Sequence, residues 1–579
     1  MARSNDLAAQ MLQEFAELLA ISGGDAFKVR AYEKAARAVA GHPAEVTGLD
    51  EKTLIAIPGV GAHLARKIIE FRETGSCQEL DELRARVPGG LRALLVVPGL
   101  GPKRARQVYD ELGITSVTEL LDALHDQRLK SLRGWGERSE ENLALAIHDA
   151  QSSGGRIHLD VALDLAGQLL GELTALPFVR HAAYAGSLRR MRETVGDIDL
   201  LVTSDQPSAV MDAFCASPRV VRVLAHGPTK SSVLTTKGVQ VDLRVVEPAV
   251  WGAALMYFTG SKPHNIHLRT LAVRARLKLS EYGLFDADSG EQLAAATEDE
   301  VYARLGLPWI PPPLREDRGE IQAALDGSLP HLVQDRDIRG DLHVHTNLTD
   351  GVATLEQMTA AARARGYAYC AITDHAPQLY MQQMTTDKAL AQRRQLRDLE
   401  TTAGIALLHG TELNIAPDGS LDWDNDFLAG FDIVVASVHS QLRQPKDQMT
   451  ARLLRAISNP NVDVIGHPMT RLIGHRPPID VDLDAIFAAA ARTGTALEIN
   501  SFPDRLDLDD ELVYRARQAG VRFAISTDAH AVPHLDYLRF GIATAQRGWA
   551  EKADVINTYP LAKLRRFLAH DKPAAKRTA

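Results

Sequence analysis

Short strings of histidine, aspartate and glutamate recur through the carboxyl-terminal part of the chain, and nearly every one follows an apolar run typical of a buried β-strand. Residues 368–372, for example, precede His375. Because side chains alternate along a strand, His343 and His345 would present both imidazoles to one face. Imidazole mixed with carboxylate suits Mn, Zn or Fe, and the ligands exceed what one ion needs, so the sequence predicts a hydrolytic centre of two or three metals. The strings are Asp341-Leu342-His343-Val344-His345, Thr373-Asp374-His375, Gly410-Thr411-Glu412, Ser437-Val438-His439, Gly466-His467-Pro468 and Thr527-Asp528-Ala529-His530.

These strings resemble the PHP (polymerase and histidinol phosphatase) family over about residues 339–579. The resemblance implies a distorted β/α barrel with its metals at the carboxyl ends of the strands, the usual place for barrel chemistry. It also implies phosphoester hydrolysis supported by two or three divalent ions, Mn²⁺ or Zn²⁺, with Glu412 as a bridging carboxylate. The ligands implied are His343, His345, Asp350, His375, Glu412, His439, His467, Asp528 and His530.

Length and charge leave room for further domains. The chain has 579 residues, of which 45% are hydrophobic and 24% charged, as in ordinary globular proteins. Its net charge of −9 excludes a uniformly basic nucleic-acid binder, so contacts with nucleic acid are expected to be local. Cys77, Cys215 and Cys370 show neither disulfide nor zinc spacing, as expected in a reducing compartment. With no apolar run of membrane-spanning length and no secretion signal, we expect a cytoplasmic, nucleoid-associated protein.

The amino-terminal part contains a repeat. The string at residues 57–61, Ile-Pro-Gly-Val-Gly, returns at residues 97–101 as Val-Pro-Gly-Leu-Gly, and a basic, helix-like segment follows each copy. One such turn is usually a plain loop, but two in register indicate helix-hairpin-helix modules. Their glycines permit a tight turn that brings backbone N–H groups to a DNA phosphate without reading a base. The residues expected to contact DNA there are Gly59, Val60, Gly61, Gly99 and Gly101.

The middle of the chain holds a second candidate catalytic group. Residues 195–202 form a strand-like run that places Asp197 and Asp199 on one face, and a second alternating run projects Asp242. Carboxylates held side by side repel one another unless a cation lies between them, which favours Mg²⁺ or Mn²⁺. A solvated acidic strand would explain the first pair alone. It does not explain the nearby Gly-Ser-x-Arg-Arg turn at residues 186–190, which suits triphosphate oxygens, so we expect a nucleotidyltransferase site.

The string Tyr257-Phe258-Thr259-Gly260-Ser261 resembles the nucleotide-contacting helix of the X family of DNA polymerases, whose best-known member is DNA polymerase beta. The match covers about residues 1–318, and together with the barrel it resembles the bacterial, two-part form of that family. The resemblance implies that Asp197 and Asp199 bind both metals and that Asp242 helps to activate the primer 3′-hydroxyl. Nucleotide contacts are implied for Ser187, Arg190, Tyr257, Phe258, Gly260, Asn265 and Arg269.

The amino-terminal helices resemble the lyase domain of the same family. Lys67 falls where the Schiff-base lysine lies, and Lys28 and Tyr32 fall on positions of the 5′-phosphate pocket. His63 replaces a lysine of that pocket. A lysine on a basic helix is also often a solvated phosphate contact, so both roles stay open for Lys67.

The expected fold is multidomain, with helical amino-terminal lyase-like and helix-hairpin-helix domains, an α+β nucleotidyltransferase palm and thumb, and a distorted β/α barrel. The expected boundaries are 1–85 for the lyase-like domain, 86–150 for the second helix-hairpin-helix segment, 151–250 for the palm, 251–318 for the thumb-like part, 319–338 for a linker and 339–579 for the barrel.

The favoured hypothesis is a DNA polymerase that fills short gaps in base excision repair, with a 3′→5′ exonuclease in the barrel and AP-endonuclease or other 3′-end processing as further activities. The expected partners are gapped or nicked double-stranded DNA and dNTPs, bound by a monomer without membrane contact. Three alternatives compete with it. The helix-hairpin-helix pair and the string at residues 257–269 argue against a non-templated or tRNA-type nucleotidyltransferase, and the intact carboxylates and full ligand set oppose a DNA-end scaffold with vestigial sites. A barrel that is a phosphomonoesterase or only structural stays open, because both hydrolytic substrates need the same metals.

Overall fold

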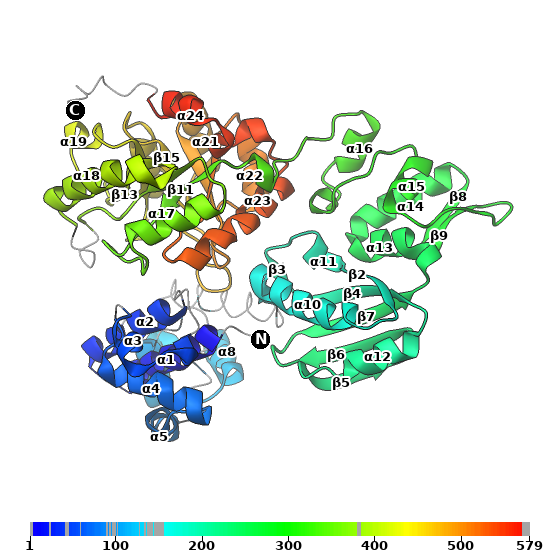
Figure 1. The fold of residues 1–579 in the computed structure, drawn as a ribbon, viewed down its shortest axis with the longest axis horizontal. Helices are drawn as coiled ribbons and strands as arrows, with labels where there is room; N and C mark the ends of the chain where they lie inside the picture. The colour runs from blue at the N-terminus through cyan, green and yellow to red at the C-terminus, as the bar shows by residue number, and fades with distance from the viewer. Residues whose placement is uncertain are drawn as a thin grey trace.

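The computed structural model describes residues 4–22, 25–40, 46–57, 59–88, 91, 94, 100, 102–126, 128–132, 135, 143, 156–378 and 384–569. Figure 1 shows a group of amino-terminal helices, a sheet with a smaller subdomain beside it, and a carboxyl-terminal barrel. Across these residues, no helix combines the length and the apolar character that a membrane crossing requires.

Amphipathic helices build the amino-terminal body, because apolar side chains recur on one face of each helix. The longest two, α1 (Ser4–Ile21) and α2 (Ala26–Ala40), stack the rings of Phe15 and Tyr32 at a centroid distance of 4.8 Å. The other helices are α3 (Glu51–Ile55), α4 (Ala62–Thr74), α5 (Gln78–Arg86), α7 (Pro102–Leu112) and α8 (Val117–His125).

The palm is a five-stranded sheet in the order β2-β4-β7-β6-β5, in which only β4 and β7 run parallel. Buried and partly buried residues alternate along β7, and buried residues alternate with less buried ones at the start of β4, as their sequences predict. A separate small pair joins β1 to β3. The elements are β1 (Ile157–His158), α10 (Leu159–Thr174), β2 (Val179–Tyr184), α11 (Gly186–Arg189), β3 (Thr194–Val195), β4 (Asp197–Ser204), α12 (Pro207–Cys215), β5 (Val220–His226), β6 (Lys230–Thr235) and β7 (Gln240–Val246).

The thumb-like part follows the palm and is held by a buried charge network. Glu298 accepts two hydrogen bonds from Arg189 of the palm and two from the buried Arg315. Burial alone would raise the pKa of Glu298, but the two arginines lower it to about 2. Helix α16 lies in the segment expected to be a linker and packs Ile321 into the thumb core. The elements are α13 (Trp251–Thr259), α14 (Lys262–Arg274), β8 (Leu277–Ser280), β9 (Gly283–Asp286), β10 (Gln292–Ala294), α15 (Glu298–Arg304) and α16 (Glu320–Leu325).

The carboxyl-terminal half is a barrel of parallel strands in the order β11 to β17, which a bridge between Val344 and Ala529 nearly closes. The strands read as continuous apolar runs because helices cover the outer face. The strands are β11 (Gly340–Val344), β12 (Tyr369–Ile372), β13 (Ala406–Asn414), β14 (Ile433–Ser437), β15 (Val464–Ile465), β16 (Ala496–Asn500) and β17 (Phe523–Ser526). The helices are α17 (Leu355–Ala364), α18 (Thr386–Ala403), α19 (Asn425–Leu428), α20 (Lys446–Ile457), α21 (Leu483–Thr493), α22 (Asp510–Gln518), α23 (Leu538–Arg547) and α24 (Leu561–Leu568).

The barrel packs directly against the palm and the thumb. Leu506 and Phe540 of the barrel join the apolar core of the palm, and Trp549 joins the core of the thumb. An ion pair between Arg471 and Glu193, 2.6 Å long, adds a polar contact at the same boundary. The barrel is therefore seated on the polymerase-like half by apolar burial as well as by charge.

Candidate active sites

The three palm carboxylates lie on two neighbouring strands. β4 and β7 pair so that Asp199 stands opposite Asp242, and Asp197 precedes them on β4. Burial and the charges of Asp197 and Asp242 raise the pKa of Asp199 to about 6. Three mutually repelling carboxylates on one face of these paired strands are a donor set that fits Mg²⁺ or Mn²⁺.

Asp242 differs from Asp199 in its partners. Gln240 donates to its Oδ1 at 2.8 Å, and the Lys230 ammonium lies 3.2 Å from its Oδ2. Burial opposes ionisation of Asp242, but the hydrogen bonds from Gln240, Ser232 and Lys230 lower its pKa below the ordinary value. The paired strands therefore hold Asp199, whose ionisation is disfavoured, beside Asp242, whose ionisation is favoured.

The Gly-Ser turn lies directly against this carboxylate pair. Ala185 donates its N–H to the Asp199 carbonyl at 2.8 Å, which ties the turn to β4. Gly186 has a φ of +60°, and a Cβ there would lie 2.3 Å from Asp199 Oδ2. Only glycine allows so close an approach of backbone to carboxylate. Ser187 follows at the start of α11 and is half-buried.

Gly186→Ala should reduce nucleotide insertion by at least about tenfold, because the added methyl displaces Asp199 while the left-handed φ costs on the order of 1 kcal/mol. Gly238→Ala is the matched control: Gly238 has a φ of +73°, but a Cβ there meets nothing within 4 Å. Primer extension by the two variants separates displacement of the carboxylate from backbone strain. Equal losses in both would show that the close approach is irrelevant.

The string at residues 257–261 forms the corner between α13 and α14. Tyr257 and Phe258 are T-shaped at a centroid distance of 5.2 Å, and Gly260 has a positive φ of 67°. Asn265 donates Nδ2 to the Tyr257 carbonyl at 2.7 Å, while its buried Oδ1 has no hydrogen-bond partner in the described chain. Arg269 is exposed one turn further along α14. The corner thus offers two aromatic rings, the Asn265 amide oxygen without a hydrogen-bond partner in the described chain, and the exposed Arg269 guanidinium.

Arg190 contacts this corner, but two hydrogen-bond acceptors hold its guanidinium group in place. Its Nε donates to Glu316 at 3.0 Å and its Nη1 donates to the Thr259 carbonyl at 2.6 Å. In the described chain these acceptors hold two of the guanidinium nitrogens and leave Nη2 for a ligand. The sequence motif predicted a phosphate-facing arginine, but not the carboxylate that holds it.

The barrel collects the sequence-predicted ligands around one carboxylate. Glu412 of β13 is 1% exposed and lies among five histidines that come from the ends of four other strands. Its oxygens lie 2.9 Å from His375 Nδ1, 3.0 Å from His467 Nε2, 3.2 Å from His439 Nε2, 3.4 Å from His343 Nε2 and 3.5 Å from His345 Nε2. A carboxylate with both oxygens facing imidazoles is placed to bridge ions.

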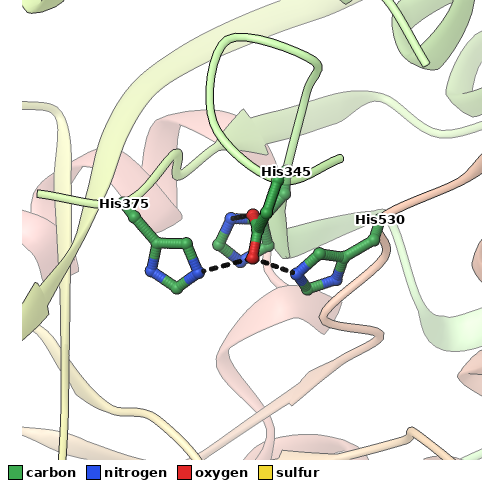
Figure 2. Close-up of side chains that lie close together, drawn as sticks. His345, His375 and His530 are labelled. Atoms are coloured by element: carbon green, nitrogen blue, oxygen red, sulfur yellow. Dashed lines mark ion pairs between the residues drawn. The ribbon is translucent and has the colours of Figure 1, made fainter. Parts of the chain in front are cut away.

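Asp350 and Asp528 complete the cluster. Asp350 Oδ2 lies 3.2 Å from His375 Nε2 and 3.3 Å from His530 Nε2, and Figure 2 shows His345, His375 and His530 converging. Asp528 Oδ1 lies 3.2 Å from His345 Nε2. Across the described residues, the groups whose possible ligand atoms all lie within 4.8 Å of one another are His345, Asp350, His375 and His530; His343, His345 and Asp528; and His375, Glu412 and His439. All three belong to the barrel, so the palm carboxylates are adjacent without converging to that spacing.

Buried ring nitrogens test whether metals fit the barrel. Nitrogen atoms of His343, His345, His375, His439 and His467 are buried without a hydrogen-bond partner in the described chain. An unsatisfied buried nitrogen is costly, and a bound cation would satisfy those that face the carboxylates, His343 Nε2, His345 Nε2 and His375 Nδ1. Divalent ions therefore fit the residues present.

The charge states of the cluster are strongly coupled. Burial alone would raise the pKa of Glu412, but the positive charges of His375, His439 and His343 hold it well below its ordinary range. Burial would likewise lower the pKa of His530, but Asp350 and then Asp528 raise it to about 9. Cations that bind here must displace protons from imidazoles, so metal affinity should fall as pH falls.

Residues behind the ligands were not predicted as part of the site. Glu498 of β16 accepts from His343 Nδ1 at 2.7 Å and so directs the other ring nitrogen inward. Asp374 accepts from Thr346 and Thr349, which fixes the loop that carries Asp350. The run at residues 496–500 resembles the other strand ends but contains no histidine, so the histidine pattern does not indicate Glu498.

Two further residues bear on the site. Asp341, part of the first metal-binding string, is fully buried and accepts from Thr527, so it joins β11 to β17 instead of facing the cluster. Arg505 lies with its Nε 3.9 Å from Asp528 Oδ2 and has a buried Nη1 without a partner in the described chain. A guanidinium there suits a phosphate oxygen.

The first hairpin turn leads into α4. Gly59 needs glycine because its φ is +94°. Gly61 has an ordinary φ of −80°, and a Cβ there meets nothing within 4 Å, so the amino end of α4 is open. Val60 is buried between them. The second-hairpin residues Gly99 and Gly101 lie outside the described residues.

Lys67 is almost fully buried, at 4% exposure, and forms a close ion pair with Glu79. Its ammonium also lies 4.6 Å from the centroid of the Phe15 ring. Tyr32 is buried against the same ring, whereas Lys28 is exposed. No sequence pattern indicates the Glu79 partner, which faces Lys67 from the next helix, α5.

Four sequence families match the chain. They are a helix-hairpin-helix domain over residues 3–77, a SAM-like helix-hairpin-helix tandem over residues 91–149, the DNA polymerase beta thumb over residues 254–316, and the PHP domain over residues 341–502. These matches fall on both halves of the molecule, the polymerase-like half and the barrel.

Among individual proteins, the DNA polymerase/3'-5' exonuclease PolX of Bacillus subtilis (strain 168) is 36% identical over 563 residues, which are 96% of this chain and 98% of that protein. DNA polymerase lambda of Rattus norvegicus is 27% identical over 332 residues, or 51% of this chain and 53% of that protein. A probable phosphatase of Shewanella sediminis (strain HAW-EB3) is 30% identical over 235 residues, or 39% of this chain and 91% of that protein. The first similarity runs along almost the whole of both chains.

Proposed function

The chain belongs to the bacterial family X DNA polymerases that carry a PHP domain, and we propose that its palm fills short gaps in DNA while its barrel trims 3′ ends. It is a repair DNA polymerase with a PHP exonuclease, it binds DNA and dNTPs, and it depends on divalent metals. The observation that carries the proposal is that one chain keeps two separate donor sets, the carboxylates around Asp199 and the cluster around Glu412.

In the palm, Asp197 and Asp199 would hold Mg²⁺ or Mn²⁺, which when bound stabilises the charge that develops during phosphoryl transfer. Asp242 would help to activate the primer 3′-hydroxyl, because its lowered pKa keeps it ionised at pH 7 and able to accept a hydrogen bond from that hydroxyl. Ser187 and Arg190 would bind the triphosphate. The corner at residues 257–269 would take the sugar through Tyr257, Phe258 and Gly260, the base edge through Asn265 and the template strand through Arg269.

In the barrel, the nine-residue cluster would hold two or three ions, Mn²⁺ or Zn²⁺, which when bound lower the pKa of a water molecule and make it a nucleophile. Histidine-rich coordination favours Mn²⁺ or Zn²⁺ over Mg²⁺. Glu412 would bridge the ions, and Glu498 would keep His343 oriented toward them. The product would be a nucleotide released from a 3′ end.

The amino-terminal helices would hold gapped or nicked DNA as part of a monomer. At the open amino end of α4, backbone N–H groups are free to meet a phosphate, and the absence of a side chain at Gly61 leaves room for it. Such a contact is independent of base sequence.

Gly61→Val should weaken binding to gapped DNA roughly tenfold, because a branched side chain would cover these N–H groups while leaving the protein interior untouched. Gly48→Val is the control, since Gly48 also has an ordinary φ and open space around its Cβ. Fluorescence anisotropy with gapped duplexes of different sequence measures the effect. Unchanged affinity at unchanged melting temperature would make the turn an ordinary loop.

One experiment tests the proposal as a whole. Purified protein is incubated with a labelled one-nucleotide gap, with and without dNTPs, in Mg²⁺ and in Mn²⁺. Insertion with dNTPs and 3′ shortening without them support the proposal. The second candidate is a phosphatase barrel, which the similarity to a probable phosphatase suggests. Release of phosphate from small phosphomonoesters, without 3′ shortening of DNA, would favour that candidate.

A further arm of this experiment tests lyase chemistry at Lys67. The substrate carries a 5′-deoxyribose phosphate at the gap margin, and borohydride reduces any Schiff base to a stable cross-link. Lys67 would have to leave Glu79 to form that bond. A cross-link that persists in Lys67→Ala, or none in the wild type, would leave Lys67 as a structural ion-pair partner.

A further inference from the structure

The last residue of helix α23, Arg547, belongs to the barrel but is used by none of its metal chemistry. Its side chain is 3% exposed. Its hydrogen-bond acceptors among the described residues lie at the boundary with the polymerase half. Nη1 donates to the Arg190 carbonyl at 2.8 Å and to Glu316 Oε1 at 2.9 Å, and Nη2 donates to Asp510 Oδ2 at 2.8 Å. A barrel side chain thus contacts the backbone of the turn that is proposed to bind the triphosphate.

Glu316 links the two arginines. The same Oε1 that accepts from Arg547 also accepts from Arg190 Nε at 3.0 Å. Burial would raise the pKa of Glu316, but Arg547 and Arg190 lower it below the ordinary value, so it is a carboxylate held between two guanidinium groups. Because Arg547 offsets part of its charge, Glu316 orients Arg190 without fully neutralising it.

The position of Arg547 is itself fixed by the seating of the barrel. Asp510, at the start of α22, receives hydrogen bonds or ion pairs from both Arg547 and Arg318, each at 2.8 Å. Close by, Trp549 is buried in the thumb core, and Phe540 of α23 is buried in the palm core. Apolar packing on both sides of Arg547 leaves it little freedom to move away from Arg190.

We propose that Arg547 is a positioning residue of the polymerase site: through Glu316 and the Arg190 backbone, the exonuclease barrel holds Arg190 where it meets the triphosphate of the incoming nucleotide. The inference rests on the triphosphate-binding role proposed above for Arg190. An arginine that binds the triphosphate equally well before and during the reaction contributes to binding of the nucleotide and not to the chemical step, so its loss appears in KM.

The test uses the full-length protein and single-nucleotide insertion into gapped DNA. Arg547→Gln should raise the KM for dNTP about tenfold with little change in kcat, since a charged hydrogen bond is worth about one factor of ten. Arg547→Lys, which keeps the charge, should give a smaller rise and guards against misfolding. Exonuclease activity and affinity for gapped DNA should stay unchanged. The matched control is Arg517→Gln, an arginine of α22 whose partners Glu551 and Asp554 both lie in the barrel.

Arg190→Gln separates the possible failures. It should raise the KM for dNTP at least as much as Arg547→Gln, and the double variant should show less than the product of the two effects. If Arg190→Gln leaves KM unchanged, the proposed triphosphate role fails and the inference falls with it. If Arg190→Gln raises KM but neither Arg547 variant does, only the positioning role of Arg547 is overturned. The same conclusion follows if the Arg547 variants lower kcat, exonuclease activity and melting temperature together.

Discussion

Asp199→Asn should reduce nucleotide insertion at least about a thousandfold, because phosphoryl transfer depends on cations placed between nucleotide and primer. Asp199 lies between Asp197 and Asp242 and is the most buried of the three. A neutral amide there would bind the ions far more weakly. Asp197→Asn and Asp242→Asn should also fail, while binding to gapped DNA and 3′→5′ degradation should survive. The measurement is single-turnover primer extension.

Stability distinguishes this loss from unfolding. The folded-state pKa of Asp199, about 6, lies above the value of a free aspartate, so its charge destabilises the metal-free protein at pH 7. This cost begins to fall as pH drops below about 6 and is gone below the free-aspartate pKa of 3.8. Asp199→Asn removes the cost, and its melting temperature without metal should be equal to or above that of the wild type. Asp205→Asn, at an exposed aspartate just beyond β4, is the control and should extend primers normally. Normal extension by any of the three palm variants would contradict the assignment.

The barrel site was the part most readable from sequence. Parallel strands bring their carboxyl ends to one side of a barrel, so histidines placed just after apolar runs must gather there whatever the loops between them do. The nine predicted ligands accordingly lie in one cluster around Glu412. The family, the fold class and the polymerase and exonuclease activities expected from the sequence are confirmed.

What the sequence left out depends on partners far apart in the chain. Alternation placed Asp197 and Asp199 on one face, but the pairing of Asp199 with Asp242 follows from sheet register, which a single strand does not encode. The sequence indicates that an apolar residue is buried, but not which residues it packs against. Nothing in the pattern therefore indicated that Phe540 of the barrel completes the core of the palm. The same holds for charged partners such as Glu316 of Arg190 and Glu79 of Lys67.

Glu412→Gln should reduce 3′→5′ degradation at least about a thousandfold and leave nucleotide insertion largely intact. Among the described residues, Glu412 is the carboxylate that faces five of the histidines, and an amide would neither bridge ions nor balance their charge. His343→Ala should act in the same direction, because an ion would lose a ligand that Glu498 holds in place. Mn²⁺ should support the wild-type reaction better than Mg²⁺.

The matched control for these variants is His409→Gln. His409 lies on the same strand as Glu412 and is equally buried, but it stacks on Phe431 at 4.7 Å and faces Arg393, away from the cluster. It should keep both activities. Degradation of a labelled primer without dNTPs and insertion with dNTPs are measured on the same preparations. If degradation survives in Glu412→Gln, or disappears instead in Asp242→Asn, the exonuclease does not reside in the barrel, because only a site outside the cluster would be indifferent to the loss of its central carboxylate.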